Sequence, residues 1–316
     1  MLIWIYTFRG GIKTIVWTDT LQTFFMLLAV GLTIYLIAAE FKLGTADLIE
    51  TVRNSEHAGI FVWDWQSPKN FFKQFFSGAF IAIVMTGLDQ DMMQKNLTCR
   101  NLQESQKNMF WFTIMLVIVN LFFLTLGALL YFYAANNGIA IPARTDDLYP
   151  VLAVQHFSLW LGIVFILGII AAAYSSADSA LTALTTSFCV DFLGFEKLER
   201  PDAKKLRMIV HLAFCAVTFF VIVIFRIIND ESVISSVFKA AGYTYGPLLG
   251  LFSFGLFTKR AIRDKWVPLI CLLSPVISYM INLNSEQWLF GYRFGFEILI
   301  LNGALTFLGL LIISKK

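Results

Sequence analysis

Eight long apolar stretches are the feature that most constrains the fold of this chain. The hydrocarbon core of a bilayer is about 30 Å thick, and a helix needs roughly 20 mostly apolar residues to cross it. The stretches are too long and too uniformly apolar for the alternating strands of a membrane β-barrel. They predict an all-α integral membrane protein with about eight transmembrane helices, at Thr14–Ala39, Phe71–Met92, Met109–Ala135, Leu159–Val190, Met208–Ile228, Val233–Phe257, Trp266–Ile281 and Phe296–Ile313.

The composition excludes several other classes of protein. Of the 316 residues, 58% are hydrophobic and 14% are charged, whereas soluble domains are roughly 45–50% apolar and about 25% charged. The net charge is only +3, and the lysines and arginines lie scattered between apolar runs. This distribution argues against a nucleic-acid partner, which would require a concentrated basic surface. The expected partner of such a surface is the lipid bilayer.

The basic residues predict how the chain is oriented. With eight helices and a cytoplasmic N-terminus, 16 of the 24 Lys and Arg residues fall in cytoplasmic segments and seven in outer segments. Cytoplasmic loops of membrane proteins carry an excess of these residues. We therefore expect a multi-pass protein of the cytoplasmic (inner) membrane with both termini in the cytoplasm.

The fourth apolar stretch carries a row of oxygen-bearing side chains. Four of them recur at helical spacing and so share one face of the predicted helix. Oxygen ligands without nitrogen or sulfur suit a hard alkali or alkaline-earth cation and do not suit zinc. The alternative is that these hydroxyls bond back to carbonyls one turn earlier or join helices at small-residue contacts. The row consists of Ser175, Ser179, Thr182 and Thr186, flanked by Ser176 and Asp178.

Asp19 lies about one turn inside the first predicted helix. An unpaired carboxylate in hydrocarbon is costly, so this group would be protonated or paired with a cation. The alternative is an aspartate at the membrane interface that interacts favourably with the dipole at the helix start.

Two other stretches are interrupted by residues that do not suit a membrane helix. Gly87, followed by Asp89 and Gln90, predicts either a break whose freed backbone groups would bind a solute or the point where the helix leaves the membrane. Lys239 lies seven residues into the sixth stretch, so it either faces a polar cavity or extends to the membrane surface. Gly246–Pro247 predicts a kink in the same helix.

No pattern typical of an enzyme accompanies these residues. The sequence contains no P-loop, and it shows neither a catalytic triad nor paired catalytic carboxylates. An aspartyl pair formed by Asp89 and Asp178 is the remaining enzymatic alternative, but neither residue lies in a protease motif. We therefore expect a protein that is not an enzyme.

Four segments of the chain, taken in order, form a recognisable set. The first runs from Tyr6 to Gln22 and contains a glycine pair followed by Thr-Asp-Thr-Leu-Gln. The second is Asp89-Gln-Asp-Met-Met-Gln-Lys-Asn-Leu, and the third is Ala172-Ala-Tyr-Ser-Ser-Ala-Asp-Ser-Ala-Leu. The fourth is Tyr245-Gly-Pro. Together they resemble the sodium/solute symporter family, which includes sodium-coupled sugar, proline, pantothenate and sialic-acid transporters, and the resemblance extends over essentially the whole chain.

The resemblance implies the leucine-transporter architecture of two five-helix repeats with inverted topology. The chain would be a single transmembrane domain, 1–316, with a partial version of this fold: core helices 5–10 and two C-terminal helices, without core helices 1–4. Residues 14–39 resemble the last helix of repeat one. Residues 70–257 resemble repeat two, and residues 264–316 would form the C-terminal accessory helices.

The resemblance also implies two sodium sites. The conserved site would take a backbone carbonyl and two hydroxyls from the fourth stretch. A second site, found in some members, would add the carboxylate of the first stretch. The family can place serine where this chain has Asp178, whose carboxylate would strengthen that site or replace it with an ion pair. The expected ligands are Ala172, Ser175 and Ser176 for the conserved site and Asp19, Asp178 and Ser179 for the second.

On the solute side, the resemblance implies a pocket that includes Met85, Asp89, Gln90, Lys239 and Tyr243. Sugar-transporting members have a stacking tyrosine at the position of Met85 and a glutamine at the position of Lys239. Both departures argue against a sugar. A lysine at this position suits an anionic solute such as a carboxylate.

The expected function is therefore sodium-coupled symport of a small organic solute across the cytoplasmic membrane. Sodium is the coupling ion, and no organic cofactor is expected. The alternative is a truncated, transport-incompetent fragment of such a symporter, because four core helices are missing from the expected architecture. A separately encoded N-terminal segment would then be a further partner.

Overall fold

A computed structural model describes residues 2–56, 58–59, 61–195, 202–228 and 232–315, with side chains described from Asp19 onward. Throughout these residues the regular structure is helical, and the one β-type pairing is an isolated antiparallel bridge between Ile262 and Ser314. The prediction of an all-α protein is confirmed. The glycine pair near Tyr6 lies in the first helix, but its neighbouring side chains lie outside the described residues.

The chain divides into two compact units, and each is described by itself. Unit 1 comprises Met1–Ala58 and Gln94–Asp230, and unit 2 comprises Gly59–Met93 and Glu231–Lys316. The short helix α4, Gln90–Asn96, begins in unit 2 and ends in unit 1. Unit 1 contains α1 (Leu2–Glu40), α2 (Thr45–Arg53), α5 (Leu102–Asn136), α6 (Leu148–Val151), α7 (Leu159–Ser187) and α8 (Ala203–Ile228). Unit 2 contains α3 (Phe71–Gly87), α9 (Val233–Phe257), α10 (Val267–Leu283), α11 (Ser285–Trp288) and α12 (Ile298–Ile313).

Three of the long helices begin at a polar side chain that caps them. Asn70, Asn101 and Ser158 accept hydrogen bonds from backbone N–H groups in the first turns of α3, α5 and α7. The first turn of a helix has no internal acceptors for these groups, so the capping side chains fix where each helix starts.

Five described helices are long and apolar enough to cross a membrane, and α3 with α4 forms a sixth candidate that is bent by 59°. The five are the segment of α1 from Asp19 onward, α5, α7 with the π-helical turn that follows it, α8, and α10 with the turn that precedes it. Helix α9 is not among these candidates, and α12 has only 16 residues. The five long apolar helices confirm an integral membrane protein. The count of eight spans stays a prediction.

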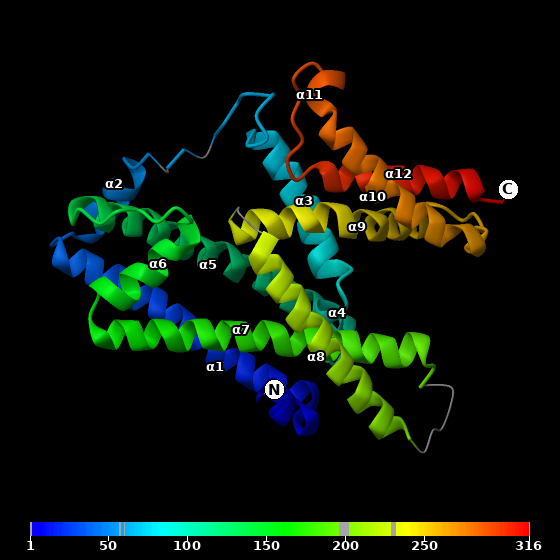
Figure 1. The fold of residues 1–316 in the computed structure, drawn as a ribbon, viewed down its shortest axis with the longest axis horizontal. Coiled ribbons are helices and arrows are strands. Elements are labelled where there is room, and N and C mark those ends of the chain that lie inside the picture. The colour runs from blue at the N-terminus through cyan, green and yellow to red at the C-terminus, as the bar shows by residue number, and fades with distance from the viewer. Residues whose placement is uncertain (1, 57, 60, 196–201, 229–231, 316) are drawn as a thin grey trace. The chain divides into compact units, whose positions relative to one another are not determined.

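Unit 1 is organised around α1, which packs along α7 and also contacts α5 (Figure 1). Val30, Ile37 and Leu129 belong to its buried apolar core. Polar contacts also lie at this core: the Thr33 and Tyr149 hydroxyls are 2.6 Å apart, and both donate to the Ala29 carbonyl, at 2.7 and 3.4 Å.

In unit 2, α9 packs along α12, and α10 packs against both of them (Figure 1). Ile81 and Val84 of α3 meet Leu249 of α9 and Leu299 of α12 in a second apolar core. Helix α3 is thereby joined to the C-terminal helices.

Helix α8 shows the surface that a bilayer requires. Its side chains Phe219, Phe220 and Ile222 are about 60% exposed. An apolar surface of this extent is unfavourable in water and suits hydrocarbon.

Candidate functional site

Asp19 on α1 contacts two side chains that are far from it in the sequence. The Ser175 hydroxyl on α7 donates a hydrogen bond to Asp19 Oδ1 across 2.5 Å. Lys95 Nζ, near the end of α4, lies 3.5 Å from Asp19 Oδ2. Each carboxylate oxygen therefore has a partner within unit 1, and the negative charge is compensated by a lysine.

The Asp19–Lys95 pair is not sealed from solvent. The Lys95 and Asp19 side chains are 34% and 23% exposed. Pairs of this exposure contribute about 0–1 kcal/mol, because water screens the attraction and the long lysine side chain loses freedom. The attraction is weak enough for another cation to compete for the carboxylate.

The predicted ligands on α7 have different environments. Asp178 and Ser179 are buried, at 1% and 5% exposure, whereas Ser176 is exposed. The Ser179 hydroxyl oxygen has no hydrogen-bond partner in the described part of the chain. A buried hydroxyl without a partner carries a cost of about 1–3 kcal/mol, so this oxygen is available to a bound ion. The structure thus joins Ser175, predicted for the conserved sodium site, to Asp19, predicted for the second site. Ser179, also predicted for the second site, lies one turn farther along α7.

A cavity of about 300 Å³ lies in unit 1 beside Ala172. Its wall includes Gly168 of α7 and Met26 of α1, together with Asp146 and Tyr149. A Cβ on Gly168 would lie 3.5 Å from Met26 Cα, so the two helices approach closely at this point. Ala172 precedes Ser175 by about one turn, which places the cavity next to the predicted ion site.

The helix is interrupted after Gly87, as the predicted break requires, and solute binding at the break stays a prediction. Helix α3 ends at Gly87 and α4 begins at Gln90, with a bend of 59° between them. Asp89 Oδ1 accepts hydrogen bonds from the backbone N–H groups of Asp91 and Met92, at 3.0 and 3.4 Å. The carboxylate of Asp89 therefore caps the second half of the broken helix.

Tyr245 joins this break to α9. Its hydroxyl donates to Asp89 Oδ2 across 3.3 Å, and its ring packs against the same apolar core as Met85. Of the predicted solute residues, Asp89 contacts Tyr245 directly, and Met85 shares an apolar core with it. Gln90 is exposed.

Tyr243 and Lys239, the other two predicted solute residues, lie on α9 one turn apart. The Tyr243 hydroxyl accepts a hydrogen bond from Asn282 Nδ2 of α10 at 2.8 Å. Lys239 is exposed. Tyr243 therefore contacts α10, whereas Tyr245 contacts Asp89.

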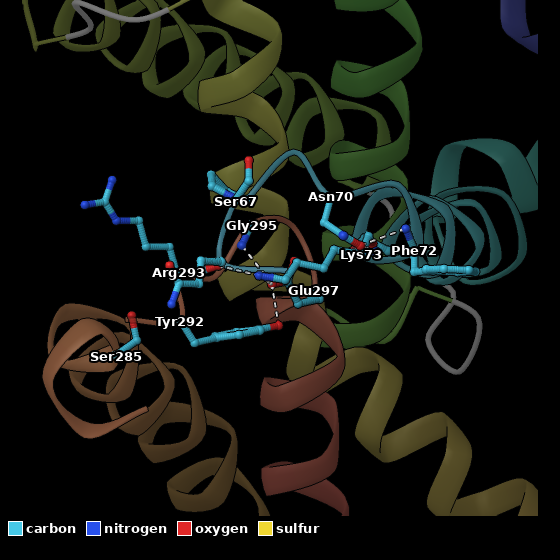
Figure 2. A network of polar contacts seen from close by, with 12 residues as sticks. Ser67, Asn70, Phe72, Lys73, Ser285, Tyr292, Arg293, Gly295 and Glu297 are labelled. Carbon is cyan, nitrogen blue, oxygen red and sulfur yellow. Dashed lines mark hydrogen bonds and ion pairs between the residues drawn. The ribbon is translucent and has the colours of Figure 1, made fainter. Parts of the chain in front are cut away.

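A second lysine, Lys73 at the start of α3, lies in a buried polar network that the sequence did not suggest (Figure 2). Its side chain is 2% exposed. Lys73 Nζ donates to the carbonyl of Arg293 at 3.0 Å and lies 4.0 Å from Glu297 Oε1. The same nitrogen lies 3.5 Å from the centre of the Tyr292 ring, within the range of a cation–π interaction.

The carboxylate of this network is held by donors as well as by charge. Glu297 Oε1 accepts hydrogen bonds from the Tyr292 hydroxyl at 2.9 Å and from the Gly295 backbone N–H at 3.0 Å. Burial, then the negative charge of Glu297 and the hydrogen bond to it, raise the pKa of Tyr292 well above its ordinary value. The ring under Lys73 therefore stays neutral and keeps its donor.

Comparison with known proteins gives one family and several relatives. The model of the sodium:solute symporter family matches residues 1–264. The chain is 26% identical over 270 residues to the sodium/sialic acid symporter of Proteus mirabilis, an alignment that covers 83% of this chain and 54% of that protein. It is 25% identical over 269 residues to the sodium/sialic acid symporter of Aliivibrio fischeri, covering 81% of this chain and 52% of that protein.

A more distant relative is the sodium-coupled monocarboxylate transporter 2 of Bos taurus, at 24% identity over 266 residues, with 79% of this chain and 42% of that protein covered. No solved structure matches the chain. The chain spans about half the length of the curated relatives it matches.

Proposed function

Because the chain belongs to the sodium:solute symporter family, we propose that it takes part in sodium-coupled symport of a small organic solute across the cytoplasmic membrane. The family is one of transporters, so the chain is not an enzyme. Sodium is the coupling ion that the family implies. The chain spans about half the length of its relatives, so symport is proposed for the complete transporter in which these helices take part.

The observation that carries the proposal is the contact between Asp19 and Ser175. It brings a carboxylate of α1 and a hydroxyl of α7 within 2.5 Å, and the unpartnered Ser179 hydroxyl follows one turn later. Carboxylate and hydroxyl oxygens are the ligands that hard cations prefer. We assign one sodium ion to Ala172, Ser175 and Ser176 and a second to Asp19, Asp178 and Ser179.

The solute we propose carries a carboxylate. Two kinds of relative are named for acids, sialic acid and monocarboxylates. Lys239 on α9 supplies a positive charge that would attract such a group, and Tyr243 lies one turn from it. Met85, Asp89 and Gln90 at the broken helix complete the proposed pocket.

The sodium gradient provides the driving force in this proposal. One charge that moves inward through a potential of 100 mV gains about 2.3 kcal/mol. A sodium ion that stabilises the outward-open state raises solute affinity in that state, because the two binding equilibria are linked. One bundle of helices would then rock against the other. We place repeat two at residues 70–257. We place both termini in the cytoplasm and residues 264–316 in the accessory helices.

Uptake of radiolabelled sialic acid into proteoliposomes tests the proposal. Ser175→Ala should raise the sodium concentration for half-maximal uptake about tenfold, because the ion loses an oxygen ligand and Asp19 loses its donor. Thr113→Ala is the matched control, since that hydroxyl is exposed on α5 and bonds only back to the Met109 carbonyl in the hydrogen bonds described. Equal sodium dependence of both variants would refute the assignment of the Ser175 hydroxyl as a sodium ligand. Unlabelled monocarboxylates should compete with the label more strongly than glucose, and the reverse order would refute the anionic solute.

A further inference from the structure

Pro247 leaves one backbone carbonyl of α9 without its helical donor. Proline has no N–H, so the hydrogen bond that residue 247 would donate to Tyr243 O, four residues earlier, cannot form. Asn302 on α12 supplies a donor in its place. Its Nδ2 lies 2.8 Å from Tyr243 O and 3.2 Å from Gly242 O. Asn302 is 0% exposed, so the carbonyl is satisfied by protein rather than by solvent.

Gly246 makes this contact sterically feasible. A Cβ at Gly246 would overlap Cγ and Nδ2 of Asn302. One turn later, a Cβ at Gly250 would overlap Thr306. Gly246 and Gly250 therefore face Asn302 and Thr306 of α12 at helical spacing. The absence of a side chain at Gly246 is what allows the Asn302 amide to reach the carbonyl that Pro247 leaves without a donor.

Tyr243 is also held at the other end of its side chain. Asn282 Nδ2 on α10 donates to the Tyr243 hydroxyl at 2.8 Å. The Tyr279 ring meets the Tyr243 ring edge to face, with centroids 5.9 Å apart. Helices α10 and α12 thus fix both the backbone carbonyl and the hydroxyl of one residue.

We propose that Asn302 and Asn282 are positioning residues for the solute pocket, acting through Tyr243. Asn302 replaces the donor that Pro247 removes and so keeps the polar segment of α9 in one conformation. Asn282 fixes the direction of the Tyr243 hydroxyl. The inference rests on the proposed function, which assigns Tyr243 to the pocket, and it gives α10 and α12 a role in solute binding.

The replacement of the missing donor predicts a specific coupling between residues 302 and 247. In purified protein, Asn302→Ala should accelerate backbone amide exchange in residues 240–250 about tenfold, the factor expected for one buried hydrogen bond. Pro247→Ala restores an N–H that can donate to Tyr243 O. In the Pro247→Ala background, Asn302→Ala should therefore change the rate of amide exchange in residues 240–250 by less than about threefold. An equal effect of Asn302→Ala in both backgrounds would overturn the inference.

A second variant keeps the test decisive where Asn302→Ala does not fold. Gly246→Ala leaves the amide in place but displaces it, so it should accelerate exchange in the same segment. Gly255→Ala is the matched control on the same helix, because a Cβ there meets no atom within 4 Å. Equal exchange in Gly246→Ala and Gly255→Ala would also overturn the inference.

Equilibrium binding of radiolabelled sialic acid in sodium tests the consequence for the pocket. Asn282→Leu should weaken binding about tenfold and have no further effect in Tyr243→Phe, which lacks the hydroxyl that Asn282 holds. Additive losses in the double variant would refute the role of Asn282. If the unaltered protein binds no sialic acid, the proposed solute is wrong, and the exchange measurements still decide whether Asn302 replaces the donor.

Discussion

Two lysine–carboxylate pairs of this protein differ in how deeply they are buried. In unit 1, Lys95 and Asp19 are 34% and 23% exposed and lie 3.5 Å apart. In unit 2, Lys73 and Glu297 are 2% and 12% exposed and lie 4.0 Å apart. The more distant pair is thus the more deeply buried one, and distance alone does not explain how each pair is stabilised.

The difference lies in what else surrounds each charge. Moving an ion from water into the protein interior costs several kcal/mol unless other groups replace its hydration. Lys73 has a carbonyl and an aromatic face (Figure 2), and Glu297 has a phenol and a backbone N–H. Asp19 has one hydroxyl besides Lys95 in the contacts described. The charges of the buried pair thus have more partners than those of the accessible pair, and only Glu297 Oε2 is left without a hydrogen bond in the described part of the network. We therefore expect the buried pair to stay intact and the accessible pair to exchange its cation.

Lys73→Met should have the largest effect on stability. The substitution removes the cation but leaves the Glu297 carboxylate buried. Breaking one side of a buried pair costs about 3–5 kcal/mol of unfolding free energy. Chemical unfolding of the purified protein in mixed micelles measures this loss.

Two further variants sharpen that result. Glu297→Gln combined with Lys73→Met should recover much of the loss, because no uncompensated charge remains. Arg293→Gln removes the exposed partner of Glu286 and should cost less than about 1 kcal/mol. If Lys73→Met lowers the free energy of unfolding no more than Arg293→Gln does, the Lys73–Glu297 network does not stabilise the position of α3.

Asp19→Asn should have the next largest effect, on sodium binding rather than on folding. A charge-assisted contact is worth about 1.5–3 kcal/mol, so sodium-22 binding to the purified protein should weaken about 10–100-fold. Asp191→Asn is the matched control, because this exposed carboxylate also accepts a hydrogen bond from a serine, Ser187, at 2.6 Å. Equal binding by both variants would contradict the role of Asp19.

The two pairs also show what the sequence could predict. Helix positions follow from hydropathy, which is a local property, and the long helices overlap the predicted apolar stretches. The bounds differ at α1, which begins at Leu2 rather than Thr14, and at α3, which ends at Gly87 rather than Met92. The break after Gly87 followed from local residue types as well. The α7 hydroxyls were predicted as ion ligands because they stand out within an apolar run, whereas the family resemblance assigned Asp19 to a sodium site.

The partners of these side chains could not be predicted in the same way. Nothing in the sequence indicated what Lys95 or Lys73 would contact. Their neighbours Asp19 and Glu297 are 76 and 224 positions away in the chain, so only tertiary packing brings them together. The same holds for Asn302, whose role depends on a proline in a different helix.

Tyr292→Phe should have a smaller effect that depends on pH. The pKa of Tyr292 is raised in the folded state, so the folded protein keeps this proton at pH values where the unfolded chain has lost it. Its contribution is fully present below about pH 10, the ordinary pKa of tyrosine, and is lost as pH rises toward the folded value. The ring is half-buried, so screening limits the loss to less than about 1 kcal/mol per pH unit. Unfolding midpoints between pH 9 and pH 11 should fall more steeply in the unaltered protein than in Tyr292→Phe, and parallel slopes would contradict this.

Lys95→Gln should have the smallest effect, a change in sodium affinity. The direction of this change shows whether the Asp19–Lys95 pair differs in role from the Lys73–Glu297 pair. If Lys95 competes with sodium for the Asp19 carboxylate, removing its charge should strengthen sodium-22 binding. An exposed pair is worth about 0–1 kcal/mol, so the gain should not exceed about fivefold. Lys95→Arg keeps the charge and should leave the affinity near that of the unaltered protein.

Weaker rather than stronger sodium binding would change the role that we assign to the Asp19–Lys95 pair. Weaker sodium binding in Lys95→Gln would mean that the lysine holds Asp19 and Ser175 in place for the ion, as Lys73 holds its own network. The accessible pair would then be structural, despite its 34% and 23% exposure. Stronger binding in Lys95→Gln with unchanged binding in Lys95→Arg requires instead that lysine and sodium occupy the carboxylate in turn, because two cations in simultaneous contact with one carboxylate would repel each other.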